Sequence, residues 1–137
     1  RLISKGNKVT AALDIEPFSE NFADKFLQEY DLDIKEKVLI EKGKLTEYAK
    51  VIIRDSLNEG ADYIHIAGAD ILTYDVIDYL KEIGRDDVTL SCCNNFKMCC
   101  GEGICGACTA RFSGHKVKRF CKEQADPRAI FEGRRFI

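Results

Sequence analysis

The chain of 137 residues is 45% hydrophobic and 32% charged, with a formal net charge of −2 at pH 7. These values are ordinary for a globular protein of about one domain. No apolar run approaches the ~20 residues that a membrane span needs, and no signal peptide opens the chain. With seven cysteines and no secretory feature, we expect a cytoplasmic protein with thiolate chemistry and without a membrane partner.

The charges are unevenly distributed. Residues 1–98 hold 13 basic and 19 acidic side chains, and residues 99–137 hold 8 basic and 4 acidic ones. A basic tail can indicate nucleic-acid binding, but thiolates close by would also attract cations. We favour this second explanation, with a solvated surface as its alternative, and expect no nucleic-acid partner. The cations concerned are Arg111, Lys116, Lys118, Arg119 and Lys122.

Residues 8–14 predict a short buried strand, which ends before Glu16-Pro17. Ser19 is a candidate N-cap for an amphipathic helix that ends in the acidic loop 31–33. Aromatic and aliphatic residues recur on one face of this helix. They are Phe18, Phe22, Phe26, Leu27 and Tyr30.

Residues 38–41 predict a second strand, which Gly43 ends. Thr46 is a candidate N-cap for the next helix, and Gly60 lies just past the C-terminus of that helix. The apolar face of the helix has five members. They are Tyr48, Ala49, Ile52, Ile53 and Leu57.

A third strand is expected over 63–67, ending at Gly68, and a fourth over 88–91. Between them, a helix is expected to begin at the N-cap Thr73 and to stop at Gly84. Strands that alternate with helices of roughly a dozen residues predict an α/β fold with a mostly parallel sheet.

The chain changes character after residue 91. We therefore expect two domains, an α/β lobe over 1–91 and a small loop-rich domain over 92–137. Within the second domain, residues 109–113 and 116–120 predict a hairpin around Ser113-Gly114. This hairpin would return the chain to the cysteines that precede it.

Three of these cysteines, Cys100, Cys105 and Cys108, follow the spacing C-x4-C-x2-C, and Cys121 comes later. This spacing is typical of a plant-type [2Fe–2S] cluster, whose fourth thiolate arrives from elsewhere in the chain. The glycines between the cysteines can adopt positive φ and turn backbone N–H groups toward the sulfurs. These glycines are Gly101, Gly103 and Gly106.

A zinc-stapled structural or interaction module without a redox role is the alternative, because Zn²⁺ also binds four thiolates. The spacing favours iron, since structural zinc sites usually combine two short C-x2–4-C pairs. A disulfide framework is the third interpretation. Three cysteines are left outside the predicted ligand set, and Cys99 would replace Cys100 if the register shifted by one. They are Cys92, Cys93 and Cys99.

The two histidines do not suggest ligands. His65 alternates with isoleucines in a predicted strand, where a structural role is expected, and His115 falls in the predicted hairpin turn. We find no nucleophile–base arrangement, no P-loop and no G-x-G-x-x-G motif. The sequence therefore predicts no catalytic residue.

The chain resembles the C-terminal part of the dihydroorotate dehydrogenase electron-transfer subunit family. Residues 98–108 match the family pattern M-x-C-G-x-G-x-C-x-x-C, and 119–122 match the segment around its fourth ligand. Residues 65–68, followed by Asp70, match the strand end that usually reads C-G-P-E. The likeness of the α/β part is looser.

The resemblance implies a truncated nucleotide-binding lobe of ferredoxin-reductase type, followed by a [2Fe–2S] domain. Cys100, Cys105, Cys108 and Cys121 would be the ligands, and Gly68 would lie near the nicotinamide of NAD(P). The intact chain would also bind FAD, as the electron-transfer subunit of an NAD(P)H-linked oxidoreductase. Its partner would be dihydroorotate dehydrogenase, as in pyrimidine biosynthesis, or a ferredoxin or hydrogenase-like protein.

The chain also departs from the family pattern. Ala69 replaces the usual proline, and the segment after Cys121 lacks the usual C-K-D-G-P. The flavin barrel and the glycine-rich first turn are missing. We therefore expect a fragment that is not catalytic and that binds NAD(P)H and flavin weakly or not at all. A missing strand would leave a sheet edge unpaired, which favours self-association.

Overall fold

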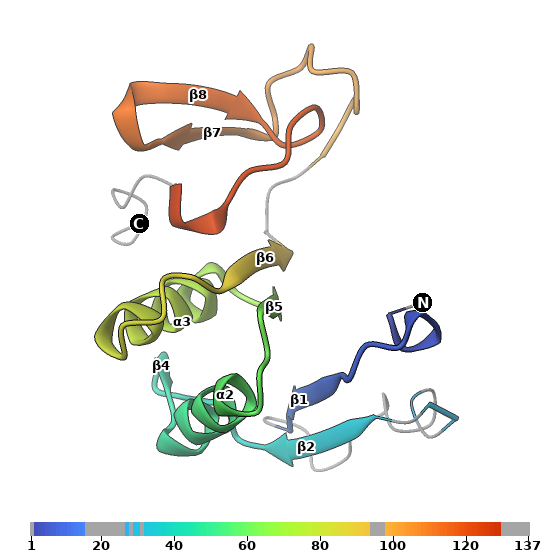
Figure 1. Cartoon of the computed structure of the whole chain (residues 1–137). Helices are drawn as coiled ribbons and strands as arrows, with labels where there is room; N and C mark the ends of the chain where they lie inside the picture. The colour runs from blue at the N-terminus through green and yellow to red at the C-terminus, as the bar shows by residue number, and fades with distance from the viewer. Residues whose placement is uncertain (1, 16–26, 28, 31, 94–97, 130–137) are drawn as a thin grey trace. The chain divides into compact units, whose positions relative to one another are not determined.

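The computed structural model describes residues 2–15, 27, 29–30, 32–93 and 98–129 (Figure 1). The chain divides into two compact units, Arg1–Ala61 and Asp62–Ile137. The described residues form a mixed α/β structure with two helices of 12 and 13 residues and four two-stranded sheets. The expected domain boundary after residue 91 falls inside the second unit and stays a prediction.

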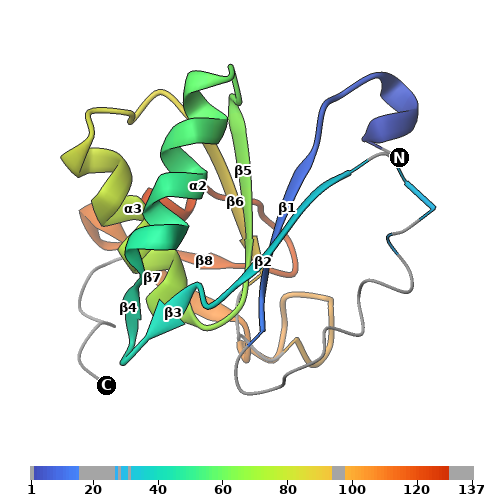
Figure 2. The same ribbon diagram turned by 90° about the horizontal axis from the view of Figure 1, so that it is seen from below.

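The first unit opens with the 3-10 helix η1, Ile3–Lys5. Strand β1, Thr10–Asp14, then pairs in parallel with β2, Asp33–Lys37, so that the two strands run side by side (Figure 2). β1 confirms that a strand forms here, but it begins at Thr10 rather than at residue 8, and its residues are half-buried or exposed rather than buried. The expectation of a loop at 31–33 was wrong at Asp33, where β2 begins.

The aromatic helix predicted after Ser19 lies outside the described residues, apart from Leu27, Glu29 and Tyr30. The strand predicted over 38–41 was wrong in its extent. Its place is taken by a short antiparallel hairpin of β3, Ile40–Glu41, and β4, Lys44–Leu45. Lys42 and Gly43 form the turn with φ of 51° and 74°, the positive pair that a two-residue hairpin loop prefers.

Helix α2, Glu47–Asn58, confirms the predicted second helix and its cap. The Thr46 hydroxyl accepts a hydrogen bond from the backbone N–H of Ala49 at 3.2 Å, which satisfies one donor of the first turn. Gly60, with φ of 99°, follows the helix. Leu57 and Ala49 are buried on the inner face.

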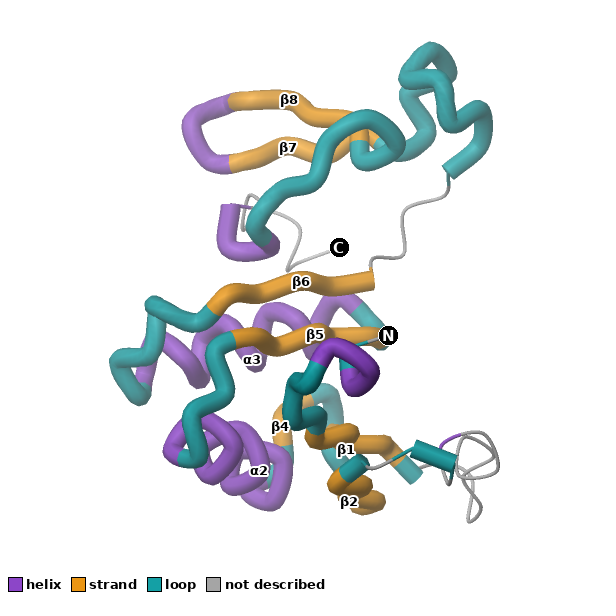
Figure 3. Tube along the Cα trace, turned by 45° about the vertical axis from the view of Figure 1, so that its right-hand side comes forward, coloured by secondary structure: helices purple, strands orange, loops and turns teal. Residues whose placement is uncertain are grey.

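The second unit is built on a βαβ crossover. β5, Tyr63–Ala67, pairs in parallel with β6, Thr89–Cys93, and α3, Asp70–Glu82, connects them (Figure 3). One face of the pair packs with α3 in an apolar core. Its fully or nearly fully buried members are Ile66, Val76, Ile77, Leu80, Val88 and Leu90.

The bounds of two predicted elements of this unit were wrong. α3 begins at Asp70 after the N-cap residue Ala69, so Thr73 does not cap the helix but is buried within it. An acidic residue in the first turn interacts favourably with the helix dipole, which explains the earlier start. β6 extends to Cys93 instead of ending at residue 91, and the predicted domain boundary therefore interrupts a strand.

The predicted C-terminal hairpin is confirmed. β7, Thr109–Phe112, pairs antiparallel with β8, Lys116–Arg119, through the 3-10 turn η2, Ser113–His115. The 3-10 helix η3, Pro127–Ala129, follows, and Arg128 within it donates to the Val88 carbonyl oxygen at 2.7 Å. This contact ties the segment after the hairpin to the residue before β6.

The predicted fold class is therefore confirmed as α/β, but not as one mostly parallel sheet. Among the described residues, two parallel pairs lie in separate units, and two antiparallel hairpins add to them. No helix in the described part of the chain is long and apolar enough to cross a membrane.

Candidate metal centre

The segment from Met98 to Cys108, called here the cysteine loop, turns repeatedly through left-handed backbone. Its three glycines all have positive φ, 68° at Gly101, 74° at Gly103 and 75° at Gly106. A side chain with Cβ is disfavoured in this conformation, so the glycines allow the loop its curvature. Successive N–H groups in such a curve point to one side and suit an anion.

Cys100 is the residue toward which these N–H groups point. The backbone N–H of Glu102 donates to its sulfur at 3.3 Å. The pKa of Cys100 falls to about 6, mainly through the N–H of Cys105, followed by the N–H of Ile104 and the Cys105 side chain. Hydrogen bonds to the charged form favour the thiolate, which is the form that binds metals.

Cys108 and Cys121 form a second pair, which the hairpin brings together. The N–H of Phe120 donates to the Cys108 carbonyl oxygen at 3.2 Å, so the chain returns beside the loop at this point. Cys108 is buried, and its pKa is lowered first by the backbone N–H of Cys121 and then by its side chain. The pKa of Cys121 is raised, chiefly by its contact with Cys108.

The four predicted ligands thus gather as two thiol pairs. Cys105 lies beside Cys100, Cys121 lies beside Cys108, and the charge of Cys100 also acts on Cys108 and Cys121. In addition, the N–H of Gly103 donates to Cys121 and so links the loop to the second pair. In the part of the chain that the structure describes, no group of three or more His, Cys, Asp or Glu residues could hold one metal ion.

Cys99 also contacts this site. Its pKa is raised, first by the charge of Cys105 and then by a hydrogen bond between the two side chains. Cys99 therefore lies close enough to compete with Cys100 for the first ligand position. The two cysteines differ in the hydrogen bonds that their sulfurs accept. N–H groups of the loop lower the pKa of Cys100 but not that of Cys99.

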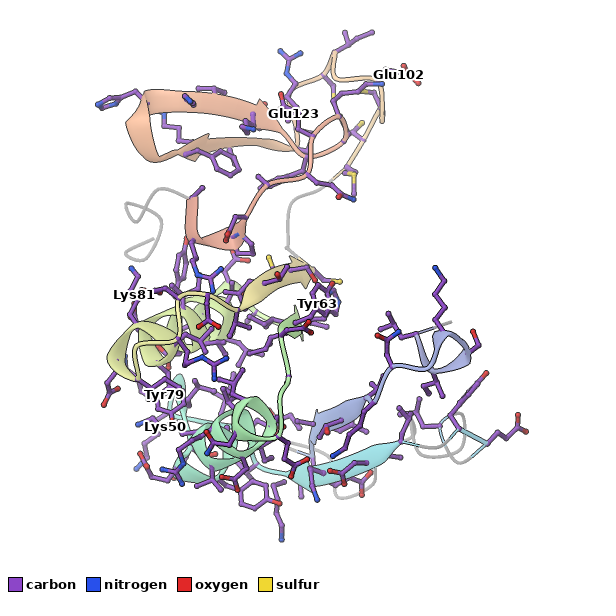
Figure 4. All side chains as sticks on the ribbon, in the orientation of Figure 1. Lys50, Tyr63, Tyr79, Lys81, Glu102 and Glu123 are labelled. Atoms are coloured by element: carbon purple, nitrogen blue, oxygen red, sulfur yellow. The ribbon has the colours of Figure 1, made fainter. Side chains whose placement is uncertain are left out.

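Basic side chains lie around the loop. Arg119 donates to the carbonyl oxygen of Gly103, and Lys122 pairs with Glu102 at 3.4 Å. Lys118 pairs instead with Glu123 at 2.7 Å, and Figure 4 labels both glutamates at this end of the hairpin. Of the five predicted cations, Arg119 and Lys122 thus contact the loop itself.

Gly68 lies in the turn between β5 and α3, at the carboxyl end of a parallel strand. Ligands of α/β proteins often bind at this edge. A Cβ at this position would lie 3.1 Å from the Leu72 side chain. Asp70 in the first turn of α3 places a negative charge where a phosphate would otherwise bind. The role of Gly68 in nucleotide binding stays a prediction.

The sequence showed no nucleophile–base arrangement, but the structure brings a cysteine and a histidine into contact. Cys93 Sγ lies 3.6 Å from His65 Nε2, and His65 Nδ1 lies 2.6 Å from Ser91 Oγ. Sequence reasoning missed this group because its members belong to two strands far apart in the chain. Side chains alternate between the two faces along residues 63–67 and 89–93. Had these strands been known to be parallel neighbours, this alternation would have placed His65, Ser91 and Cys93 on one face of the pair.

The sequence matches no protein-family model, and no curated protein matches it.

Proposed function

We propose that Cys100, Cys105, Cys108 and Cys121 hold a [2Fe–2S] cluster, and that the protein transfers electrons through it. The observation that carries the proposal is the gathering of these four cysteines as two thiol pairs around inward-pointing N–H groups. When bound, a [2Fe–2S] cluster accepts and donates single electrons.

The pairwise arrangement suits two metal atoms better than one. A structural zinc site gathers four ligands around one ion, with Zn–S distances of about 2.3 Å. The thiols here gather as Cys100 with Cys105 and Cys108 with Cys121. Two thiolates for each of two irons is the ligand count of a [2Fe–2S] cluster.

The surrounding residues would tune the site. N–H groups of Glu102 and Gly103 donate to thiols of different pairs, and such hydrogen bonds stabilise negative charge on sulfur. The side chains of Arg119 and Lys122 supply positive charge at the loop. Burial of Cys108 reduces the access of water to the second pair. The solvent exposure of a cluster is a further determinant of its reduction potential.

The electron donor and acceptor follow from the resemblance to the dihydroorotate dehydrogenase electron-transfer subunit family. On that basis, the chain belongs to an NAD(P)H-linked oxidoreductase whose intact form binds FAD and NAD(P), with Gly68 beside the nicotinamide. The described crossover of β5, α3 and β6 is compatible with the last part of a nucleotide-binding lobe. The partner would be a dihydroorotate dehydrogenase, a ferredoxin or a hydrogenase-like protein.

Spectroscopy and metal analysis of anaerobically prepared protein test the proposal. Protein produced with added iron should be brown, contain about two irons per chain, bleach with dithionite and give the EPR signal of a reduced [2Fe–2S] centre. The zinc alternative predicts a colourless protein. A folded, iron-free protein with one zinc per chain from this preparation would overturn the proposal.

A further inference from the structure

A second reactive group lies on the face of the β5–β6 pair that is opposite α3. Because side chains alternate along a strand, Tyr63 and His65 of β5 share this face with Ser91 and Cys93 of β6. The other face carries Ile66 and Leu90 into the apolar core. Tyr63 is 47% exposed and is labelled in Figure 4. The face therefore presents polar and nucleophilic groups that the proposed cluster does not use.

These four side chains form one continuous chain of contacts. Cys93 Sγ lies 3.6 Å from His65 Nε2, His65 Nδ1 lies 2.6 Å from Ser91 Oγ, and Ser91 Oγ lies 2.5 Å from Tyr63 Oη. One proton assignment satisfies every contact in the same direction. His65 Nδ1–H donates to Ser91, the Ser91 hydroxyl donates to Tyr63, and the free Nε2 accepts from the Cys93 thiol.

This arrangement has the parts of an activated nucleophile. A thiol lies within reach of a base, and the base is oriented by a third group on its other nitrogen. We propose that Cys93 is a nucleophilic thiol, activated by His65, that forms mixed disulfides with low-molecular-weight disulfides. His65 is the base that touches the thiol, whereas Ser91 and Tyr63 are positioning residues.

The reaction balances as a thiol–disulfide exchange. The Cys93 proton moves to His65 Nε2, and the thiolate attacks one sulfur of the disulfide. The new S–S bond joins Cys93 to that sulfur, and the disulfide's own S–S bond breaks. The leaving thiolate takes the proton from His65. Cys93 is thereby oxidised, and the second half of the disulfide leaves as a reduced thiol.

A disulfide is the electrophile that this site fits best. Exchange needs a thiolate, a leaving thiol and access to the sulfur, and it needs no donors for a developing oxyanion. Cys93 and His65 are both exposed, which gives this access. The next residue provides a contrast, because Cys92 lies on the other face, is half-buried and has its pKa raised mainly by burial. The two adjacent thiols should therefore differ sharply in reactivity.

The proposal is independent of the metal centre. Cys93 is not one of the four proposed ligands, and its partner His65 belongs to β5. Reactivity at Cys93 would persist if the cysteine loop bound zinc, and an iron–sulfur cluster would be unaffected if Cys93 proved inert. An experiment can therefore refute either proposal without refuting the other.

The experiment uses the full chain with its metal bound and oxidised glutathione as the probe. After timed exposure, digestion with trypsin releases residues 86–97, which carry both Cys92 and Cys93, and fragmentation in the mass spectrometer assigns the adduct. We expect Cys93 to react at least about tenfold faster than Cys92, and His65→Gln to slow Cys93 by at least about tenfold. The Cys92 rate should not change.

Three variants complete the test. His115→Gln removes the other histidine and should leave the Cys93 rate unchanged, and Cys93→Ser should abolish the adduct at this position. Ser91→Ala should slow Cys93 less than His65→Gln does, and it provides a second test if His65→Gln fails to fold by far-UV circular dichroism. Equal rates at Cys92 and Cys93, or a Cys93 rate that neither His65→Gln nor Ser91→Ala changes, would overturn the proposal.

Discussion

The cysteine loop and the β5–α3–β6 layer belong to the same unit, but different interactions hold them. In the layer, Leu80 is fully buried, and Val76, Ile77 and Val88 are nearly so. In the loop, Ile104 is 82% exposed and Met98 66% exposed. The loop is shaped by positive-φ glycines and by hydrogen bonds from backbone N–H groups to sulfur.

This difference predicts where binding of the proposed cluster would contribute to folding. Burial of apolar area stabilises the layer without any ligand. The loop buries few apolar side chains, so its order should depend on what its thiolates bind, as in other small metal-binding segments. Loss of the proposed cluster should therefore loosen the loop and leave the layer folded.

The largest effect should come from removing a proposed ligand. Cys100→Ser should abolish the cluster, because a serine oxygen is a harder and poorer iron ligand than a thiolate. Iron per chain and visible absorption should fall to background, while the far-UV circular dichroism of the α/β layer should be retained.

Cys99→Ser is the matched control, because Cys99 neighbours Cys100 and also contacts Cys105. It should keep iron near the wild-type level. If instead Cys99→Ser loses the cluster and Cys100→Ser keeps it, the ligand register is wrong by one residue. If Cys100→Ser also unfolds the layer, the stability of the layer depends on the cysteine loop.

The converse change removes apolar volume from the layer. Leu80→Ala should lower the free energy of unfolding by about 3 kcal/mol, because the Leu80 side chain is fully buried and the truncation leaves a cavity. Urea unfolding followed by far-UV circular dichroism measures this change. Visible absorption in the absence of urea should stay at the wild-type level.

Val51→Ala is a suitable control, since Val51 lies on α2 and is 37% exposed. It should cost well under half as much as Leu80→Ala, because little apolar area is lost at a partly exposed position. A Leu80→Ala protein that binds no iron although it is folded would show that the loop depends on the core of the layer.

Much of the fold follows from local patterns. The bounds of β5 were predicted correctly, because a short apolar run lies between a charged residue and a glycine. The Thr46 cap of α2 and the β7–β8 hairpin were also correct, since caps and turns depend on residues a few positions apart. The candidate ligand set could likewise be predicted from the sequence, because it rests on the spacing of the four cysteines along the chain.

The elements that were wrong or missed depend on distant partners. β2 has the sequence DIKEK, whose charged residues do not follow the pattern expected of a strand. The strand forms because it pairs with β1. Periodicity predicted parallel strands but not that they would form two separate pairs. The contact of Cys93 with His65 depends on the register of β5 and β6, which sequence spacing alone does not provide.

The smallest effect should come from a change in loop geometry alone. Gly103 has a φ of 74°, and a Cβ there would lie 3.2 Å from Lys122 Cγ. Gly103→Ala should destabilise the loop by about 1–2 kcal/mol through the left-handed conformation, and the contact with Lys122 should add to this. The N–H of Gly103 also donates to Cys121, so a shift of this residue would disturb the second thiol pair.

Gly101 provides the matched comparison, because its φ is 68° but a Cβ there would meet nothing within 4 Å. Iron loss to an added chelator should therefore be faster in Gly101→Ala than in wild type and fastest in Gly103→Ala. Adding Lys122→Ala to Gly103→Ala should return the rate to that of Gly101→Ala, since the contact is removed and the φ cost remains. Lys122→Ala alone should change the rate little, because its ion pair with Glu102 is exposed. Equal rates for Gly101→Ala, Gly103→Ala and wild type would mean that the glycines do not control the loop, and that its thiolate ligands alone determine its order.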